Sequence, residues 1–242
     1  MEDSAPAPQT QSRRLTRSIW LCVTLACIAG AAYLQFFRTD GNLRDEAATS
    51  VPSQLPIFGQ VQDFTLTERD GRTLTLKSLT GRVWIADFFF ASCGATCPIM
   101  TDRLKLVREE LDRDGLSDVV CVSVSVDPAR DTPGVLRDYA ARHHASPTHW
   151  LFLTGTMTEI EKLATKSFNL GAPEPVPGED QILHSEKFFL VDQAGRIRGA
   201  YASITPAEED DLMHVPAGSP MPENEKKRMI ADIRALFRDS AR

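Results

Sequence analysis

Two cysteines, Cys93 and Cys97, are the side chains of this 242-residue chain whose types and spacing point most directly to chemistry. Three residues separate them, an apolar run at 83–90 precedes them, and Pro98 follows at once. Thiolates are soft ligands that select Cu(I), or Zn²⁺ where more ligands are present, and two thiols also form a redox couple with their disulfide. The spacing leaves both chemistries open, because such a pair can converge on one metal ion or close a disulfide.

The segments on either side of the pair predict a strand, a helix and a second strand. The run 83–90 is almost entirely apolar, as is typical of a strand buried on both faces. Pro98 suits the first turn of a helix, and apolar residues recur at roughly helical spacing over 99–115. A β-branched run at 119–126 predicts the next strand. The thiols are therefore expected at the carboxyl end of a strand, where open α/β sheets bind ligands.

The remaining pattern predicts an α/β thioredoxin-like sandwich with an N-terminal β-hairpin extension. The hairpin is expected at 64–76, where two alternating segments flank Asp70-Gly71. Further elements are expected at 132–143 (helix), 150–153 (strand), 157–168 (helix), 188–191 and 196–201 (strands) and 223–238 (helix). The fold class follows from this alternation of strands and helices and the hairpin that ends it.

The N-terminal segment predicts one transmembrane helix, a signal anchor at 18–37. Residues 19–37 carry no charge, and at about 1.5 Å per residue they can cross a hydrocarbon core about 30 Å thick. Three arginines lie in the tail 1–17, so the positive-inside rule places that tail in the cytoplasm. We expect a single-pass protein of the cell inner membrane, with a linker at 38–60 and a folded domain at 61–242 on the periplasmic side.

Two alternatives for this segment stay open. The first is a signal peptide cleaved near Ala29-Gly30-Ala31, but the apolar run is longer than a usual signal core of about 7 to 15 residues. The second is lipidation at Cys27, whose preceding residues match a lipidation signal poorly. Cys22 and Cys27 are most simply small apolar packing residues of the anchor.

Composition argues against two further classes of protein. The formal net charge is −6 and the sequence has no extended basic stripe, so nucleic-acid binding has no electrostatic support. Five cysteines are too few for a disulfide scaffold in a chain of this length. Cys121 lies inside a strand-like run, and we expect it to be a buried packing residue.

A metal site built on the two cysteines needs a further ligand, and the chain has five histidines. His184 stands out because it directly precedes the strand expected at 188–191. In a thioredoxin-like sheet this entry loop lies beside the strand that leads to Cys93. His184 is therefore the first histidine to consider as a further ligand, although a lone histidine is more often structural than a ligand.

The other four histidines have simpler interpretations. His143, His144 and His149 lie at the end of an expected helix and in the loop after it, where solvated side chains are the default. His214, with Met213 and Met221 nearby, could form a second soft site. The acidic segment around it is expected to be a flexible loop, which argues against that role.

Asp127, Arg130 and Asp131 follow the strand expected at 119–126. They could line the rim of the metal face or dock a partner. A structural role is the simpler one, with Asp127 as a turn residue and Asp131 or Thr132 as a helix N-cap.

Four landmarks together resemble the SCO/SenC family of copper-binding, membrane-anchored, thioredoxin-like proteins. They are the Cys-x-x-x-Cys-Pro motif at 93–98, the Asp-Pro-x-Arg-Asp-Thr motif within 123–133, the turn at 153–156, and His184-Ser185 ahead of a strand. The resemblance covers about three quarters of the chain, from about residue 60 to about residue 240. The joint spacing is much more specific than any one motif.

The resemblance implies a mononuclear copper site in each monomer. Cys93 and Cys97 would supply thiolates and His184 an imidazole nitrogen, a set that holds Cu(I) and tolerates Cu(II). It also implies a metallochaperone, rather than primarily an enzyme, that delivers copper to the binuclear copper centre in subunit II of cytochrome c oxidase. A copper-donor chaperone and a thiol reductant would be its further partners.

The chain departs from the family pattern at two places. Many relatives carry Pro-Asp after the first cysteine, where this chain has Gly94-Ala95, so the loop between the thiols is expected to be more flexible. Residues 180–183 lack the Val-Asp that often precedes the family histidine. A carboxylate that orients the imidazole would then be absent, or supplied by Asp180 or Glu186.

Two other functions share this fold. A thiol–disulfide oxidoreductase without a stably bound metal would use Cys93 and Cys97 as its redox pair and would not require His184. A thiol peroxidase would need a cysteine of low pKa at a helix N-terminus with an arginine nearby. The thiol spacing does not exclude the oxidoreductase.

Overall fold

The computed structural model describes residues 55–146, 148–171, 185–216 and 218–240. The predicted anchor at 18–37, its flanking segments and His184 lie outside these ranges. Within the part of the chain that is described, no helix combines the length and apolarity needed to cross a bilayer. The described residues all belong to one compact unit, 53–242.

One eight-stranded sheet forms the centre of this unit, in the order β1-β8-β7-β4-β5-β6-β2-β3. The strands are β1 (Gly59–Gln60), β2 (Thr65–Glu68), β3 (Thr73–Thr75), β4 (Trp84–Phe89), β5 (Val120–Ser125), β6 (Trp150–Thr154), β7 (Ser185–Val191) and β8 (Arg196–Ala202). Strand β5 runs parallel to both β4 and β6, and the other pairings are antiparallel. The expected mixed α/β architecture, related to thioredoxin, is confirmed.

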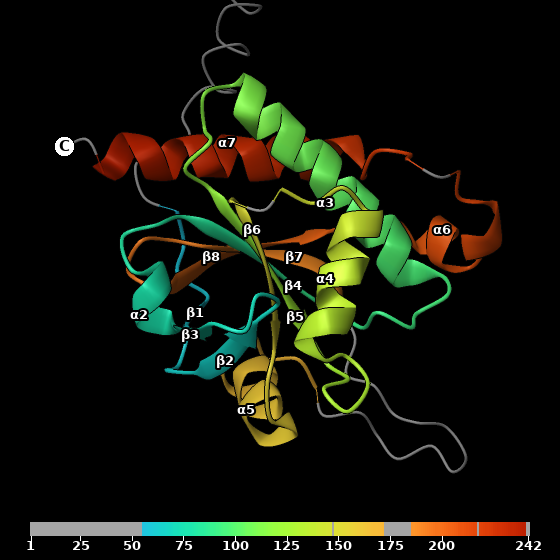
Figure 1. The fold of residues 1–242 in the computed structure, drawn as a ribbon. Coiled ribbons are helices and arrows are strands. Elements are labelled where there is room, and N and C mark those ends of the chain that lie inside the picture. Colours follow the sequence, from blue (N-terminus) through green and yellow to red (C-terminus); the bar gives the residue numbers. More distant parts are fainter. Residues whose placement is uncertain (1–54, 147, 172–184, 217, 241–242) are drawn as a thin grey trace, which may run out of the picture. The chain divides into compact units, whose positions relative to one another are not determined.

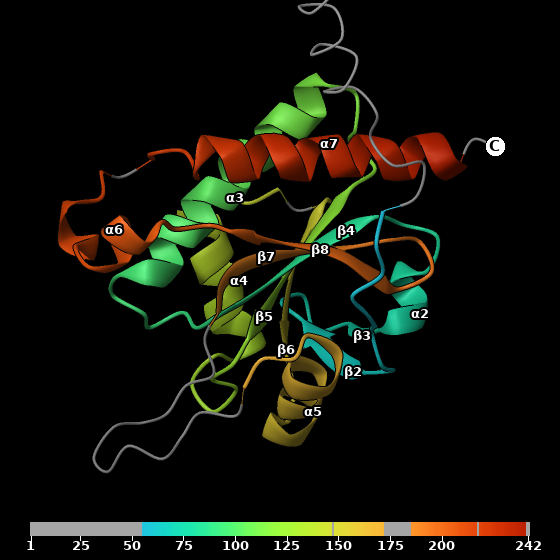
Figure 2. The same cartoon turned by 180° about the vertical axis from the view of Figure 1, so that it is seen from behind.

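Helices cover both faces of the sheet (Figures 1 and 2). They are α2 (Leu76–Leu79), α3 (Thr96–Arg113), α4 (Pro133–Arg142), α5 (Met157–Lys162), α6 (Pro206–Glu209) and α7 (Glu223–Ser240). A π-helical turn at Leu163–Ser167 continues α5, and a 3-10 turn at Leu212–His214 follows α6. One core lies under α3, α4 and α7, and a second lies between the opposite face of the sheet and α5.

Strand β4 shows why the sequence folds this way. Its side chains are all buried, and they alternate between the two cores because successive residues of a strand point to opposite faces. Ile85 and Phe89 pack under α3 and α4, whereas Trp84 and Phe88 pack on the α5 side. Burial on both faces explains the almost uninterrupted apolar run, and it makes β4 a rigid support for the loop that follows it.

The predicted hairpin is confirmed as β2 and β3, with Gly71 in its turn at φ +90°. The hairpin extends the sheet beyond β6, since β2 pairs with β6. Several details differ from the expectation, and one is that the acidic segment expected to be a flexible loop contains α6 and the 3-10 turn. The helix expected at 157–168 is α5 followed by the π-helical turn, and the end of the segment expected as a linker, Gly59–Gln60, forms strand β1 against β8.

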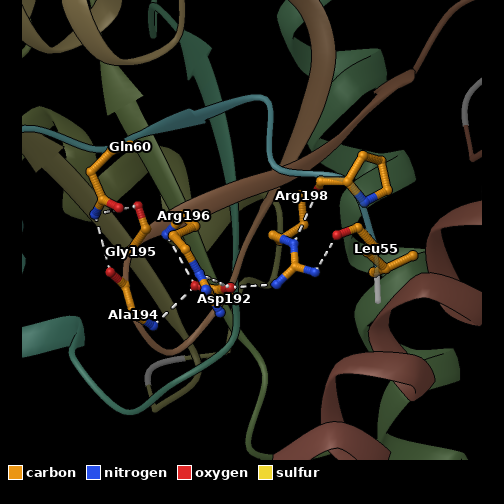
Figure 3. A network of polar contacts seen from close by, with 8 residues as sticks. Leu55, Gln60, Asp192, Ala194, Gly195, Arg196 and Arg198 are labelled. Atoms are coloured by element: carbon orange, nitrogen blue, oxygen red, sulfur yellow. Dashed lines mark hydrogen bonds and ion pairs between the residues drawn. The ribbon is translucent and has the colours of Figure 1, made fainter. Parts of the chain in front are cut away.

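Arginines and an aspartate tie this first strand to the sheet (Figure 3). Asp192 accepts bonds from Arg196 Nε at 2.8 Å and Arg198 Nη1 at 2.7 Å, and Arg198 also donates to the carbonyl oxygen of Leu55. Gln60 Nε2 lies 3.1 Å from the carbonyl oxygens of residues 194 and 195. Burial raises the pKa of Asp192, but the bonds from Arg198 and Arg196 outweigh it and leave the pKa below its ordinary value. The described chain is thus held firmly where it enters the sheet.

Candidate metal centre

The two cysteines lie where strand β4 gives way to helix α3. A short loop follows Phe89, and α3 begins one residue before Cys97. Cys93 is half-buried, Cys97 is 4% exposed, and both thiols are free. The Cys97 backbone N–H donates to Cys93 Sγ at 3.3 Å, and the Cys93 N–H donates to the carbonyl oxygen of Phe90 at 3.2 Å. The first turn of α3 therefore presents its free N–H groups to the Cys93 sulfur.

This geometry gives the two thiols opposite protonation. The Cys97 thiol and the backbone N–H groups of Cys97, Ala95 and Thr96 lower the pKa of Cys93 to about 5, against the opposing effect of burial. The same contact and its own burial raise the pKa of Cys97 far above the ordinary thiol value. At neutral pH the pair is a Cys93 thiolate and a Cys97 thiol. A thiolate is the form that binds soft metals and attacks disulfides.

The loop that carries Cys93 is fixed from below by Asp131. The Asp131 carboxylate accepts the Ala91 backbone N–H at 2.9 Å and the Ser125 hydroxyl at 2.6 Å, and burial raises its pKa. The cap of α4 is Thr132, whose hydroxyl accepts from a backbone N–H in the first turn. Asp131 thus ties the thiol loop to the end of β5, a role more specific than the expected N-cap.

Cys97 is held on its other side by a buried chain of hydroxyl groups. Thr101 Oγ1 donates to the Cys97 carbonyl oxygen at 2.9 Å and lies 2.8 Å from the Tyr139 hydroxyl. The Tyr139 ring contacts Phe89 with centroids 5.0 Å apart, and His143 at 4.5 Å. Helices α3 and α4 thereby clamp the second thiol against the sheet.

Asp87 is a buried acid near the thiols that is not among the site residues predicted from sequence. It lies in β4 with 1% exposure, and the Ser123 hydroxyl donates to it at 2.6 Å. Burial raises its pKa to about 7. Its negative charge also contributes to the high pKa of Cys97. A lone acid within the apolar run 83–90 was the available signal.

None of the described histidines forms a metal-binding group with Cys93 and Cys97. His143 is mostly buried, and its Nδ1 lies 2.9 Å from Asp102 Oδ1, so the expectation of a solvated side chain was wrong here. The ring of Tyr139 contacts it because His143, the C-cap of α4, follows Tyr139 by one helical turn. His214 is exposed and pairs with Asp211 at 2.6 Å. Within the described ranges, no group of three or more His, Cys, Asp and Glu side chains is arranged to hold a metal ion.

His184, the expected third ligand, lies outside the described residues. Its chain neighbour Ser185 begins β7 and pairs with Phe88 of β4, the strand that leads into the thiol loop. The two cysteines fit a soft metal ion, because one sulfur is already a thiolate and the other lies in hydrogen-bonding contact with it.

A cavity of about 250 Å³ adjoins the thiol loop. Gly94 and Ala95, the residues between the cysteines, line it together with Ile99 and Met213. Met213 is 86% exposed. The second soft site considered for Met213, His214 and Met221 is not assembled in the described residues, where no group of three or more His, Cys, Asp and Glu side chains is arranged to hold a metal ion and Met221 is buried in the core. The segment that carries Met213 instead forms one wall of the cavity.

An α/β sheet with a thiolate–thiol pair between its central strand and the following helix defines a thioredoxin-like dithiol protein. Residues 57–213 match the SCO1/SenC family model, and the chain belongs to this family, which relates it to the Sco1 cytochrome c oxidase assembly proteins. It is 38% identical over 159 residues to the SCO1 protein homolog of Bacillus subtilis, covering 65% of this chain and 81% of the relative.

Two solved structures are similar over nearly their whole length. BsSco, described as a member of the Sco family of cytochrome c oxidase assembly proteins with a disulfide switch, superposes with a TM-score of 0.60 at 33% identity, covering 76% of this chain and 97% of BsSco. Yeast Sco1 with copper bound gives a TM-score of 0.51 at 29% identity, covering 72% of this chain and 95% of that structure.

Proposed function

We propose that this protein is a membrane-anchored copper metallochaperone that binds one copper ion through the thiolates of Cys93 and Cys97 and the imidazole of His184. It delivers that ion to the binuclear copper centre in subunit II of cytochrome c oxidase. The observation that carries the proposal is the preformed thiolate–thiol pair, in which the Cys97 N–H donates to Cys93 Sγ. The copper-bound structure of yeast Sco1, a relative with the same fold, supports copper as the cargo.

The site residues divide the work of metal uptake. The Cys93 thiolate is available to make the first bond, because its pKa lies about two units below neutral pH. Cys97 must lose its proton before it can act as a second thiolate ligand, so metal binding and proton release are coupled. The contacts of Asp131 and Thr101 hold both cysteines in place while this happens.

Anaerobic copper titration, followed by absorption spectroscopy against a competing Cu(I) chelator, tests the proposal. We expect one copper per monomer, with binding lost in Cys93→Ser and Cys97→Ser and strongly weakened in His184→Ala. Cys121→Ala is the matched control, because Cys121 is a buried thiol of β5 outside the thiol loop. Reduced protein that takes up no Cu(I) would overturn the proposal.

We place the working site on the periplasmic side of the inner membrane, held there by the anchor at 18–37. Its partners are then the oxidase subunit, a copper-donor chaperone and a reductant that keeps both thiols reduced. The reductant is needed because thiols outside the cytoplasm tend to oxidise to disulfides. Metal binding thus depends on the redox state of the same two sulfurs.

Thiol–disulfide reduction of partner cysteines is the second candidate function. It is favoured by the asymmetry of the pair, since a half-exposed thiolate followed by a buried thiol suits attack on a disulfide and resolution of the mixed disulfide. His184→Ala separates the two functions. A variant that keeps full function in cells while losing copper affinity would favour reduction over metal delivery.

A further inference from the structure

Two neighbouring cavities lie along the first half of helix α3. The first, of about 250 Å³, adjoins the thiol loop at Gly94 and Ala95. The second, of about 310 Å³, is lined by Lys105, Arg142 and the two histidines after α4. Asp102 and Gly218 line both cavities, so the two form one groove that starts beside the thiols and follows the helix.

The length of this groove matches a short extended peptide. Lys105 lies ten positions after Ala95, and at 1.5 Å per residue this corresponds to about 15 Å of helix. An extended chain advances about 3.3–3.6 Å per residue, so about five residues span the groove. A peptide with a cysteine at the thiol end therefore places a side chain about four residues away at the Lys105 end.

The two ends of the groove differ in chemistry. Near the thiols the lining is apolar, with Ile99, Leu212 and Val215, and a Cβ placed on Gly94 would meet no atom within 4 Å. That end is therefore open to an incoming chain. At the far end lie two cations, Lys105 and Arg142.

The Asp102 carboxylate, in the middle of the groove, does not form an ion pair with Lys105 or Arg142. Asp102 Oδ1 is bound to His143 Nδ1 at 2.9 Å. Among the described residues, Lys105 and Arg142 have no ion-pair partner within 4.0 Å. The Arg142 guanidinium lies over the Tyr139 ring at 5.6 Å, which leaves its donors free to bind an anion. The far end of the groove is thus suited to a carboxylate.

The outer wall of the groove is fixed before any partner arrives. Arg103, fully buried, donates to the carbonyl oxygen of Ser203 at 2.6 Å and binds Glu208 at 2.5 Å. It also reaches the carbonyl oxygen of Ser219 at 3.3 Å. One side chain of α3 therefore anchors both ends of the segment that carries Leu212 and Val215. A preformed wall costs less ordering on binding.

We propose that this groove binds an extended segment of the protein that exchanges copper or electrons with Cys93. The segment presents a cysteine at the thiol end, small or apolar residues against Ile99, and an acidic residue about four positions further along against Lys105 and Arg142. This inference rests on the proposed function, because it names the partner surface of the same thiol pair.

Mixed-disulfide formation with short synthetic peptides tests the groove without requiring copper. Each probe has about five residues, with a cysteine at one end, activated as its thionitrobenzoate disulfide, and glutamate or lysine at the other end. Both chain directions are made. The Cys93 thiolate attacks the peptide sulfur, a new disulfide forms, the old one breaks, and the thionitrobenzoate anion leaves and is followed by its absorbance. The full chain in neutral detergent is used, and Cys93→Ser gives the background from other thiols.

For one of the two chain directions, we expect the glutamate peptide to react about threefold to tenfold faster than the lysine peptide at low ionic strength. This is the size of effect expected when one glutamate forms two weakly screened charge pairs, with Lys105 and with Arg142. The preference shrinks in high salt. It is lost in Lys105→Glu/Arg142→Glu and kept in Lys166→Glu, which reverses an exposed charge on the opposite face of the sheet. Reaction with activated cysteine alone stays unchanged in all three proteins and shows that the thiol site is intact.

Equal rates for the glutamate and lysine peptides would overturn the proposal that this groove binds the partner segment. A preference for glutamate that survives Lys105→Glu/Arg142→Glu would overturn it as well. Rapid disulfide-linked dimerisation in place of peptide capture would also overturn it, because a second copy would then be the occupant. Failure of the proposed function looks different. It would leave the peptide preference in place while the reduced protein takes up no Cu(I).

Discussion

Copper uptake at neutral pH should release about one proton from the thiol pair rather than two. With a pKa of about 5, Cys93 is roughly 99% thiolate at pH 7, so it has almost no proton to lose. Cys97, whose pKa is raised by its contact with Cys93 and by burial, is fully protonated and must lose one proton.

The expected release from the thiol pair is therefore about 1.0 proton per copper at pH 7, against about 1.9 for two independent thiols of pKa about 8.5. The count is measured by isothermal calorimetry of Cu(I) transfer in buffers of different ionisation enthalpy. Below pH 5 it should rise, because Cys93 then also carries a proton. A count near two at pH 7 that does not change with pH would refute the account of the paired thiols.

Three further predictions concern the supports of the site, and each is measured by urea unfolding of the compact unit 53–242. Asp131→Ala removes the acceptor for Ala91 and Ser125 and should cost about 1–3 kcal/mol. Glu208→Gln should cost about 1–3 kcal/mol, because the buried Arg103 guanidinium then has only neutral acceptors, among them the carbonyl oxygen of Ser203 and the carbonyl and hydroxyl oxygens of Ser219. Arg103 lowers the pKa of Glu208 to about 2, so this contribution is present above about pH 4.5 and is lost as the pH falls toward 2. Phe88→Ala, on the face away from α3, should cost about 3–5 kcal/mol while one copper still binds.

Each support prediction has its own contrary result. Unchanged stability in Asp131→Ala would mean that the thiol loop holds itself in place. If Glu208→Gln retained the acid-induced loss between about pH 4.5 and 2, another carboxylate would be responsible for it. Loss of copper binding in Phe88→Ala would show that the two faces of the sheet are not independent.

Much of the fold around the thiols is predictable from sequence because local patterns and tertiary packing agree there. The apolar run 83–90 became β4, the helical spacing after Pro98 became α3, and Asp70-Gly71 marked the hairpin turn. Strand β1 was missed because a strand of two residues is too short to show an alternating pattern of apolar and polar side chains. The π-helical turn after α5 was missed because its apolar residues continue the helical spacing, and only the backbone geometry distinguishes the two.

The chemistry of the site was less accessible to sequence. The pair Cys93 and Cys97 could be selected from spacing, but their opposite pKa shifts depend on which sulfur receives the N–H groups of α3. His143 was misjudged because its burial comes partly from Asp102, 41 residues earlier on α3, and partly from the ring of Tyr139 one turn earlier on α4. The role of Asp131 likewise depends on the approach of Ala91 from a loop 40 residues away.

The most direct test of the central claim is the anaerobic Cu(I) titration of the reduced full chain and of His184→Ala against the same chelator. The account predicts one tightly held copper in the wild-type protein. His184→Ala should keep the same stoichiometry but bind copper at least tenfold more weakly, the effect expected when a metal site loses one ligand or the contact that orients it. Equal affinity in the two proteins would contradict the three-ligand site, and no uptake by the wild-type protein would contradict copper binding altogether.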